Sequence, residues 1–96
     1  MKIVELRPGM RRVEITGKIV EKSETRQVTT RFGDASRVAT AVLQDESGTV
    51  KLSLWNEAID QVNVNDTVKI ENGYVTTFRG ETQLNVGRYG TISVVS

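Results

Sequence analysis

Hydrophobic and polar residues alternate along most of this chain, and a period of two is typical of β-strands with one buried face. The first such segment spans residues 11–22, and the apolar positions expected to point inward are Val13, Ile15 and Ile19. Gly17 lies among them and predicts a bend or bulge, as at the corner of a barrel. Residues 1–10 are expected to form a short lead-in segment, with Leu6 and Met10 packed onto the core.

Four further segments have strand character, and they span residues 37–45, 49–56, 67–77 and 81–95. A polar stretch, residues 23–36, is expected to form a long loop after the first strand. Residues 57–66 are expected to form a short helical turn between the third and fourth strands. In the fourth strand the inward phase shifts by one residue at Asn72-Gly73, which predicts a β-bulge that turns Tyr74 outward. The second strand is apolar on both phases, so its two faces stay unassigned.

The number and order of these elements favour a small all-β barrel. Five strands within 96 residues, with a long first loop and a helical piece after strand three, match the oligonucleotide/oligosaccharide-binding (OB) barrel. An SH3-like barrel is the structural alternative. We therefore expect a single five-stranded OB-fold domain over residues 1–96, with a short helical turn between strands three and four.

Composition narrows the classes of function. The chain has no Cys and no His, which removes thiolate chemistry, the usual zinc ligands and the commonest general base. It contains no Gly-rich phosphate loop and no nucleophile–base pair, and Asp45 and Glu46 precede Ser47-Gly48 as turn-forming residues. We expect a binding protein that is not an enzyme and uses no metal or cofactor. No apolar run reaches about 18 residues, so no membrane contact is expected and the protein is predicted to be intracellular.

Trp55 is the most informative single residue. By alternation it lies on the polar face of the third strand with Lys51 and Ser53, and a large indole there needs a reason. Two interpretations are open. The indole could cap the end of the barrel, with its N–H bonded to a neighbour, or it could offer a flat surface for a ligand.

Tyr74 and Phe78 favour the second interpretation. After the bulge they fall on one outward face, four residues apart, whereas the inward positions are mostly Val, Ile and Leu. Three outward rings form a platform on which bases can stack, and stacking needs no sequence match. The alternative is that Tyr74 and Phe78 wrap a barrel corner and pack on each other.

Basic residues accompany the rings, although the net charge is only +1. The candidates for phosphate contacts are Arg26, Arg31, Arg37, Lys51, Arg79 and Arg88. Glu24, Asp34 and Glu81 lie among them and weaken the attraction. Phe32, in the long first loop, could close over a bound strand or tuck back onto the barrel.

Three stretches of the chain are informative together: LRPGMRRVEITGKIVEKSETRQV (6–28), LQDESGTVKLSLWNE (43–57) and VKIENGYVTTFRGETQLNVGRYGTI (68–92). They resemble a known family, the simple single-stranded DNA-binding proteins of archaea and eukaryotes, related to the DNA-binding domains of replication protein A. The last stretch is most similar to the archaeal single-domain type. The resemblance implies an OB barrel that coats single-stranded DNA in replication, recombination and repair.

The resemblance also implies roles for individual residues. It places the stacking rings at Trp55, Tyr74 and Phe78, and polar or basic contacts at Lys51, Arg79, Gln83, Asn85 and Arg88. Many family members carry a tail that recruits replication or repair proteins, and this chain ends at Ser96 without one. The implied location is the cytoplasm of an archaeon or the nucleus of a eukaryote.

Two other functions stay open at this stage. The ligand could be single-stranded RNA, because stacking tolerates both sugars and only contacts to the 2′-OH distinguish them. The barrel could instead be a protein-interaction subunit, with the exposed rings as its partner surface.

Overall fold

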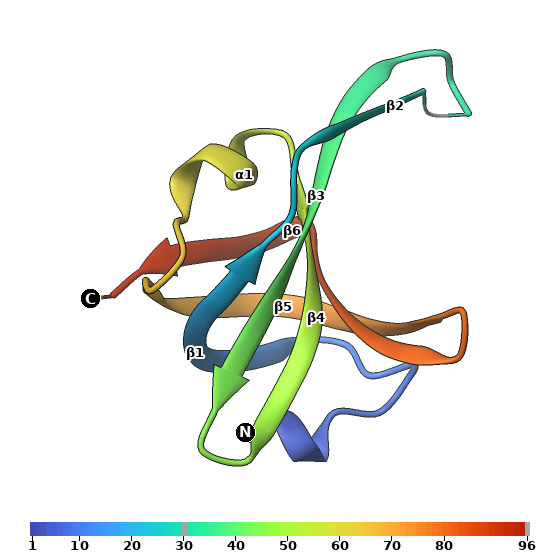
Figure 1. The fold of residues 1–96 in the computed structure, drawn as a ribbon. Coiled ribbons are helices and arrows are strands. Elements are labelled where there is room, and N and C mark those ends of the chain that lie inside the picture. The colour runs from blue at the N-terminus through green and yellow to red at the C-terminus, as the bar shows by residue number, and fades with distance from the viewer. Residues whose placement is uncertain (30, 96) are drawn as a thin grey trace.

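The computed structural model describes residues 1–29 and 31–95, and for residues 87–89 it describes the backbone only. Its strands are β1 (Val13–Lys22), β2 (Arg26–Thr29), β3 (Ala35–Asp45), β4 (Gly48–Trp55), β5 (Thr67–Phe78) and β6 (Glu81–Val94). A 3₁₀ helix, η1 (Ile3–Glu5), precedes β1, and a short helix, α1 (Glu57–Gln61), joins β4 to β5 (Figure 1).

The strands pair in the order β1-β5-β6-β4-β3-β2, and an additional pairing of β1 with β3 closes five of them into a ring. The pairing of β4 with β6 is parallel, and the other pairings are antiparallel. β2 stands outside this ring, because it pairs with β3 alone among the described strands. The five-stranded barrel expected from the sequence is therefore confirmed.

Residues 23–36 do not form the long loop that was expected from the sequence, because part of this segment is a strand. Its middle forms β2, which makes a hairpin with the first residues of β3 and projects beyond the barrel (Figure 1). Three of the four residues of β2 are exposed, and the fourth is half-buried. A strand without a buried face has no apolar alternation, so the pattern that identified the other strands could not identify this one.

Inward-facing side chains fill the barrel with Val, Ile, Leu and Ala. The alternation of β1 is confirmed, since Val13, Ile15 and Ile19 are all buried. Gly17 lies where β1 leaves β5 and joins β3, because its neighbour Lys18 is in register with both Thr67 and Gln44. A Cβ at Gly17 would lie 2.8 Å from the carbonyl oxygen of Gln44, so the corner requires glycine.

The bulge predicted in the fourth strand is present in β5. The register with β6 shifts between Glu71 and Gly73. After this shift Val75 is buried while Tyr74 is exposed. The bulge thereby brings a tyrosine onto the outer face of the barrel.

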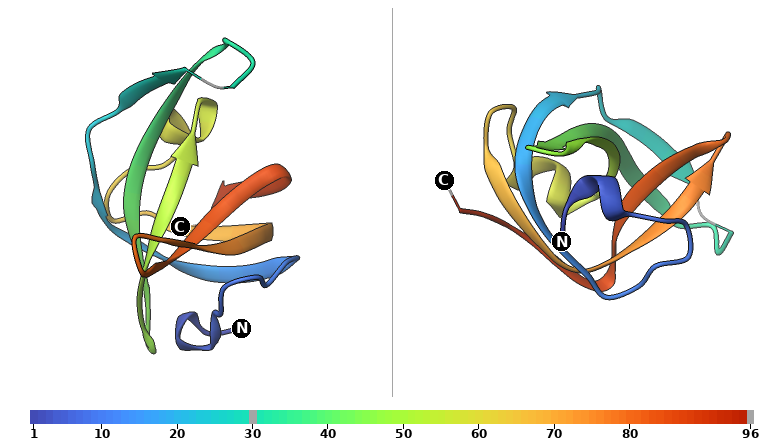
Figure 2. Two further views of the ribbon diagram at one scale, coloured as in Figure 1. Left: turned by 90° about the vertical axis from the view of Figure 1, so that its right-hand side faces the viewer. Right: turned by 90° about the horizontal axis from the view of Figure 1, so that it is seen from below.

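Each end of the barrel is covered by a short helical element. α1 seals one end with Ile59, and the Lys22 ammonium fastens it by donating to the backbone carbonyls of Ile59 and Val62. η1 lies across the opposite end, as the view from below in Figure 2 shows, and buries Ile3. Leu6 is also buried, which agrees with its expected packing on the core.

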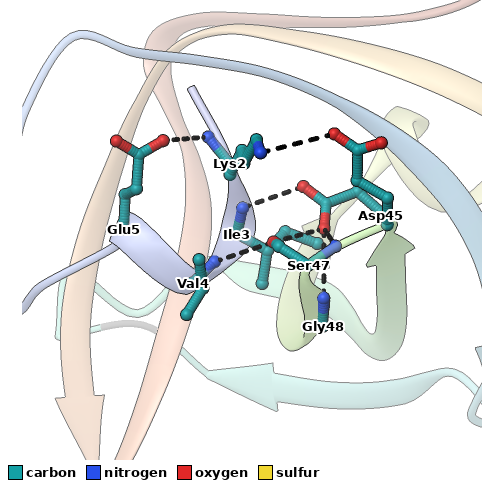
Figure 3. Close-up of polar contacts among 8 residues, drawn as sticks. Lys2, Ile3, Val4, Glu5, Asp45, Ser47 and Gly48 are labelled. Carbon is teal, nitrogen blue, oxygen red and sulfur yellow. Dashed lines mark hydrogen bonds and ion pairs between the residues drawn. The ribbon is translucent and has the colours of Figure 1, made fainter.

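A carboxylate tethers η1 to the turn between β3 and β4 (Figure 3). Asp45 accepts hydrogen bonds from the backbone N–H groups of Ile3 (2.8 Å), Ser47 (2.7 Å) and Gly48 (3.2 Å), and from the Ser47 hydroxyl (2.6 Å). Burial alone would raise the pKa of Asp45, but these bonds to the ionised form lower it below its ordinary value of 3.8. The turn-forming role expected for Asp45 is thus confirmed, and it also anchors the lead-in segment.

Candidate nucleic-acid interface

The register of β4, β5 and β6 sets the outward side chains of the barrel in rows. One row runs from Ser53 through Asn85 to Tyr74, and the next runs from Lys51 through Gln83 to Thr76. Adjacent strands lie about 4.8 Å apart, so each row forms a short continuous surface. Residues far apart in the sequence therefore share one face.

A groove of about 560 Å³ lies over these rows. Its lining includes seven of the residues expected to bind nucleic acid, which are Arg26, Lys51, Trp55, Phe78, Arg79, Gln83 and Asn85. The groove therefore combines two exposed rings, three cations and two amides. Glu81 also lines it and is the one carboxylate among the described lining residues.

Trp55 ends β4 and is 41% exposed. Its cross-strand partner is Val38 of β3. The next residue, Asn56, has a φ of 50° and is held against Arg37, because its side-chain oxygen accepts from the Arg37 N–H at 3.0 Å and its N–H donates to the Arg37 carbonyl. These two hydrogen bonds fix the backbone of Asn56, the residue that follows Trp55. Among the described residues no side chain or backbone group hydrogen-bonds the indole, so the barrel-cap interpretation gains no support.

Tyr74, 40% exposed, lines a second hollow of about 780 Å³. Trp55 lines this hollow as well as the groove, so the indole stands between the two. The other wall of the hollow comes from α1 and includes Glu57 and Gln61. Phe78 and Tyr74 therefore do not lie in one pocket: Phe78 lines the groove, Tyr74 lines the second hollow, and Trp55 lines both.

Phe78, 58% exposed, ends β5 at a two-residue hairpin turn. Arg79 and Gly80 both have positive φ, 52° and 80°, as a type I′ turn requires. The Arg79 guanidinium lies 5.2 Å from the centroid of the Phe78 ring, within the range of a cation–π contact. The turn thereby presents a ring and a cation side by side at one end of the groove.

The floor of the groove is polar, and its buried amide is hydrogen-bonded within the protein. Asn85 is only 8% exposed, and its amide donates to the Thr76 hydroxyl at 3.0 Å and to the Gln83 carbonyl at 3.3 Å. Ser53 is also buried beside it in the same row. Pattern reasoning missed the contribution of β3, where Val38 and Thr40 line the groove, because that strand is apolar on both phases.

Besides Tyr74, three of the expected contact residues that the structure describes lie outside the groove: Arg31, Phe32 and Arg37. Arg37 makes an ion pair with Asp60 of α1 at 3.0 Å. Arg31 and Phe32 lie in the turn of the β2–β3 hairpin, where Phe32 is 84% exposed and is therefore not packed back onto the barrel. The side chain of Arg88 lies outside the described residues.

The described part of the chain has neither a metal-binding cluster nor a membrane-spanning helix. No group of three or more Asp or Glu residues is placed to hold a metal ion within the described ranges. Over the same residues, no helix is both long and apolar enough to cross a lipid bilayer.

The chain is similar to known single-stranded DNA-binding proteins. Residues 6–94 match the family model described as single-stranded DNA binding protein Ssb-like, OB fold. The chain is 38% identical over 95 residues to the single-stranded DNA binding protein Ssb of Saccharolobus solfataricus, with 99% of this chain and 64% of that protein covered. It is 32% identical to the replication factor A of Methanothermobacter thermautotrophicus, with 99% of this chain and 13% of that protein covered. The chain therefore spans less than two thirds of the length of these relatives.

Solved structures match over the whole chain. The second OB-fold domain of replication protein A from Methanococcus maripaludis superimposes with a TM-score of 0.83 at 24% identity, covering 100% of this chain and 94% of that one. An identity this low supports the fold alone. Together with the family model, it confirms the OB barrel expected from the sequence.

Proposed function

The chain belongs to the Ssb-like family of OB-fold single-stranded DNA-binding proteins, and from this premise we propose that it binds single-stranded DNA without sequence preference during DNA replication. The relatives named Ssb and replication factor A support this role. Recombination and repair, which expose the same form of DNA, are included in the proposal.

The single observation that supports this mechanism is the set of three exposed aromatic rings on the outside of the barrel. Phe78, Trp55 and Tyr74 line two hollows that meet at the indole. Stacking on an aromatic side chain contributes about 1–3 kcal/mol per base, and every base has a flat face. Unpaired bases can reach these rings, whereas the bases of a duplex are already stacked on one another.

Phosphates are held by the cations beside the rings. Lys51 and Arg79 line the groove with Arg26 of the projecting hairpin. Each neutralised phosphate contributes a slope of about −0.7 to the dependence of log K on log salt for single strands. The three groove contacts together contribute about −2 to this slope. The binding involves no chemical step.

The experiment uses the single tryptophan of the chain. Trp55 fluorescence is followed while oligo-dT, oligo-rU or a matched duplex is added. We expect strong quenching by oligo-dT and a weak response to duplex. The ratio of the dT and rU affinities decides between DNA and RNA.

A second measurement separates stacking from charge. Anisotropy of a labelled oligo-dT is expected to report an affinity about 5- to 150-fold lower for Trp55→Ala, the equivalent of one lost stacked base. Trp55→Phe keeps a ring and serves as the matched control, with most of the affinity retained. Unchanged affinity in Trp55→Ala would contradict stacking at this position. Absence of binding by any nucleic acid would favour a protein-interaction role instead.

A further inference from the structure

Two arginines in the lead-in to β1, Arg11 and Arg12, have no role in the interface described so far. They lie outside the two hollows that contain the rings. Both side chains are exposed, and no ion pair or hydrogen bond of either side chain occurs within residues 1–29 and 31–95. Exposed cations with no counter-ion are available to a ligand.

The backbone places these two residues against Tyr74. The N–H of Gly9 donates to the carbonyl of Val75 at 2.9 Å, and the N–H of Val75 donates to the carbonyl of Met10 at 3.0 Å. At the other end of the segment, Val13 is in register with Gly73. Two residues of the lead-in, 11 and 12, therefore face one residue of β5, Tyr74. This is the two-against-one arrangement of a β-bulge.

Arg11, Arg12 and Tyr74 are all exposed, so their side chains lie on the outside of the barrel. The hydrogen bonds on one side and the register of Val13 with Gly73 on the other hold residues 11 and 12 across from Tyr74. Residues opposite each other in an antiparallel pair have Cβ atoms about 5 Å apart, and diagonal neighbours are still within reach of long side chains. The two arginines and Tyr74 therefore lie next to one another on the outer surface.

Two further details set this pair apart. Arg12 has a φ of 54°, the left-handed region that arginine rarely adopts. The nearest acidic residue in the chain, Glu14, is engaged with Lys69 at 3.4 Å. The positive charge of the pair is thus not cancelled by the adjacent carboxylate.

We propose that Arg11 and Arg12 bind the phosphates flanking the nucleotide whose base stacks on Tyr74. The path of the strand then continues from the groove, past Trp55 and across β5, to the start of β1. Guanidinium groups suit this task, because their planar fork matches a phosphate with two parallel hydrogen bonds. This inference rests on the proposed single-stranded DNA binding and extends it to a site on the barrel edge.

The test compares salt dependence. Binding of a labelled oligo-dT is measured between 50 and 200 mM salt for the parent, the double variant Arg11→Gln/Arg12→Asn, and Arg11→Lys/Arg12→Lys. Asparagine tolerates the left-handed conformation at position 12, so the fold is retained. We expect the slope of log K against log salt to become less negative by about 1.4 in the first double variant, and the lysine variant to keep the parent slope.

A matched single-charge control is Lys18→Gln, which removes an exposed cation from the middle of β1, in register with Thr67, and is expected to leave the slope unchanged. A coupling measurement adds Tyr74→Ala. If the arginines hold the nucleotide stacked on Tyr74, the effects of removing the ring and the arginines are less than additive. The single variant Arg11→Gln, which leaves position 12 intact, is expected to change the slope by about 0.7.

The outcomes separate this inference from the function on which it rests. A parent protein that fails to bind oligo-dT overturns the proposed function. A parent that binds with Trp55 quenching, while the double variant keeps the full slope, leaves that function standing and overturns the role of Arg11 and Arg12.

Discussion

Replacing Arg79 by asparagine should change stability and binding in opposite directions. Arg79 occupies the first central position of a type I′ turn with a φ of 52°. The left-handed conformation costs an ordinary L-residue roughly 1–2 kcal/mol, and asparagine tolerates it better. Relief of this strain, less the lost cation–π contact with Phe78, which is worth about 0.5–1 kcal/mol at an exposed site, should raise the free energy of unfolding by about 0.5–1 kcal/mol for Arg79→Asn. For a domain of this size that is a gain of roughly 2–8 °C in Tm.

The same substitution removes a cation from the groove. It also removes the guanidinium that lies 5.2 Å from the Phe78 ring centroid. Loss of one phosphate contact should weaken oligo-dT binding on the order of five-fold at low salt. The slope of log K against log salt should become less negative by about 0.7.

Thermal unfolding followed by circular dichroism measures the first effect, and oligonucleotide anisotropy measures the second. Arg79→Lys is the matched control, since it keeps the charge and the left-handed strain. Its Tm and salt slope should stay close to those of the parent. A lower Tm for Arg79→Asn would refute the claim of backbone strain, and an unchanged slope would refute the phosphate contact.

Three further predictions follow from the fold and the groove floor. Gly17→Ala should destabilise the barrel by at least about 1 kcal/mol, measured by urea unfolding, because the new Cβ would lie 2.8 Å from a backbone oxygen; a neutral effect would show that the corner can open. Asp45→Asn should lower Tm at pH 7, and the difference from the parent should shrink as the pH falls below 3.8, since the lowered pKa of Asp45 gives stability that is present above that pH and lost on protonation. A difference independent of pH would contradict the lowered pKa. Asn85→Asp should cost about 1–3 kcal/mol of stability, because a carboxylate oxygen would replace the amide donor to the Gln83 carbonyl. It should also weaken oligo-dT binding by adding a negative charge, whereas full affinity would exclude Asn85 from the DNA path.

The alternation of apolar and polar residues predicts those parts of the fold that depend on burial. The alternation in β1, the glycine corner and the one-residue shift at Asn72-Gly73 each follow from the need to keep apolar side chains inside a small barrel. This alternation does not predict β2, because no residue of that strand is fully buried. That strand exists because its backbone groups pair with β3, and backbone pairing leaves no trace in the order of side chains.

The candidate site also has features that the sequence predicts and features that only the tertiary structure shows. The outward positions of Trp55, Tyr74 and Phe78 follow from local alternation, so the sequence determined that a row of rings would be exposed. Their grouping depends on which strands lie together, and the parallel pairing of β4 with β6 joins residues 32 positions apart in the chain, such as Lys51 and Gln83. That pairing sets Ser53 beside Asn85 and creates the groove.

The charges depended most on tertiary structure. Six basic residues were equivalent candidates in the sequence, yet the fold sets Lys51, Arg79 and Arg26 in the groove and engages Arg37 with Asp60. It also brings Arg11 and Arg12, which local pattern gave no reason to single out, against Tyr74. The sequence by itself determined a barrel with exposed rings, because burial is a local property of alternating side chains. Only the tertiary structure decided which charges accompany those rings, because that depends on the register between distant strands.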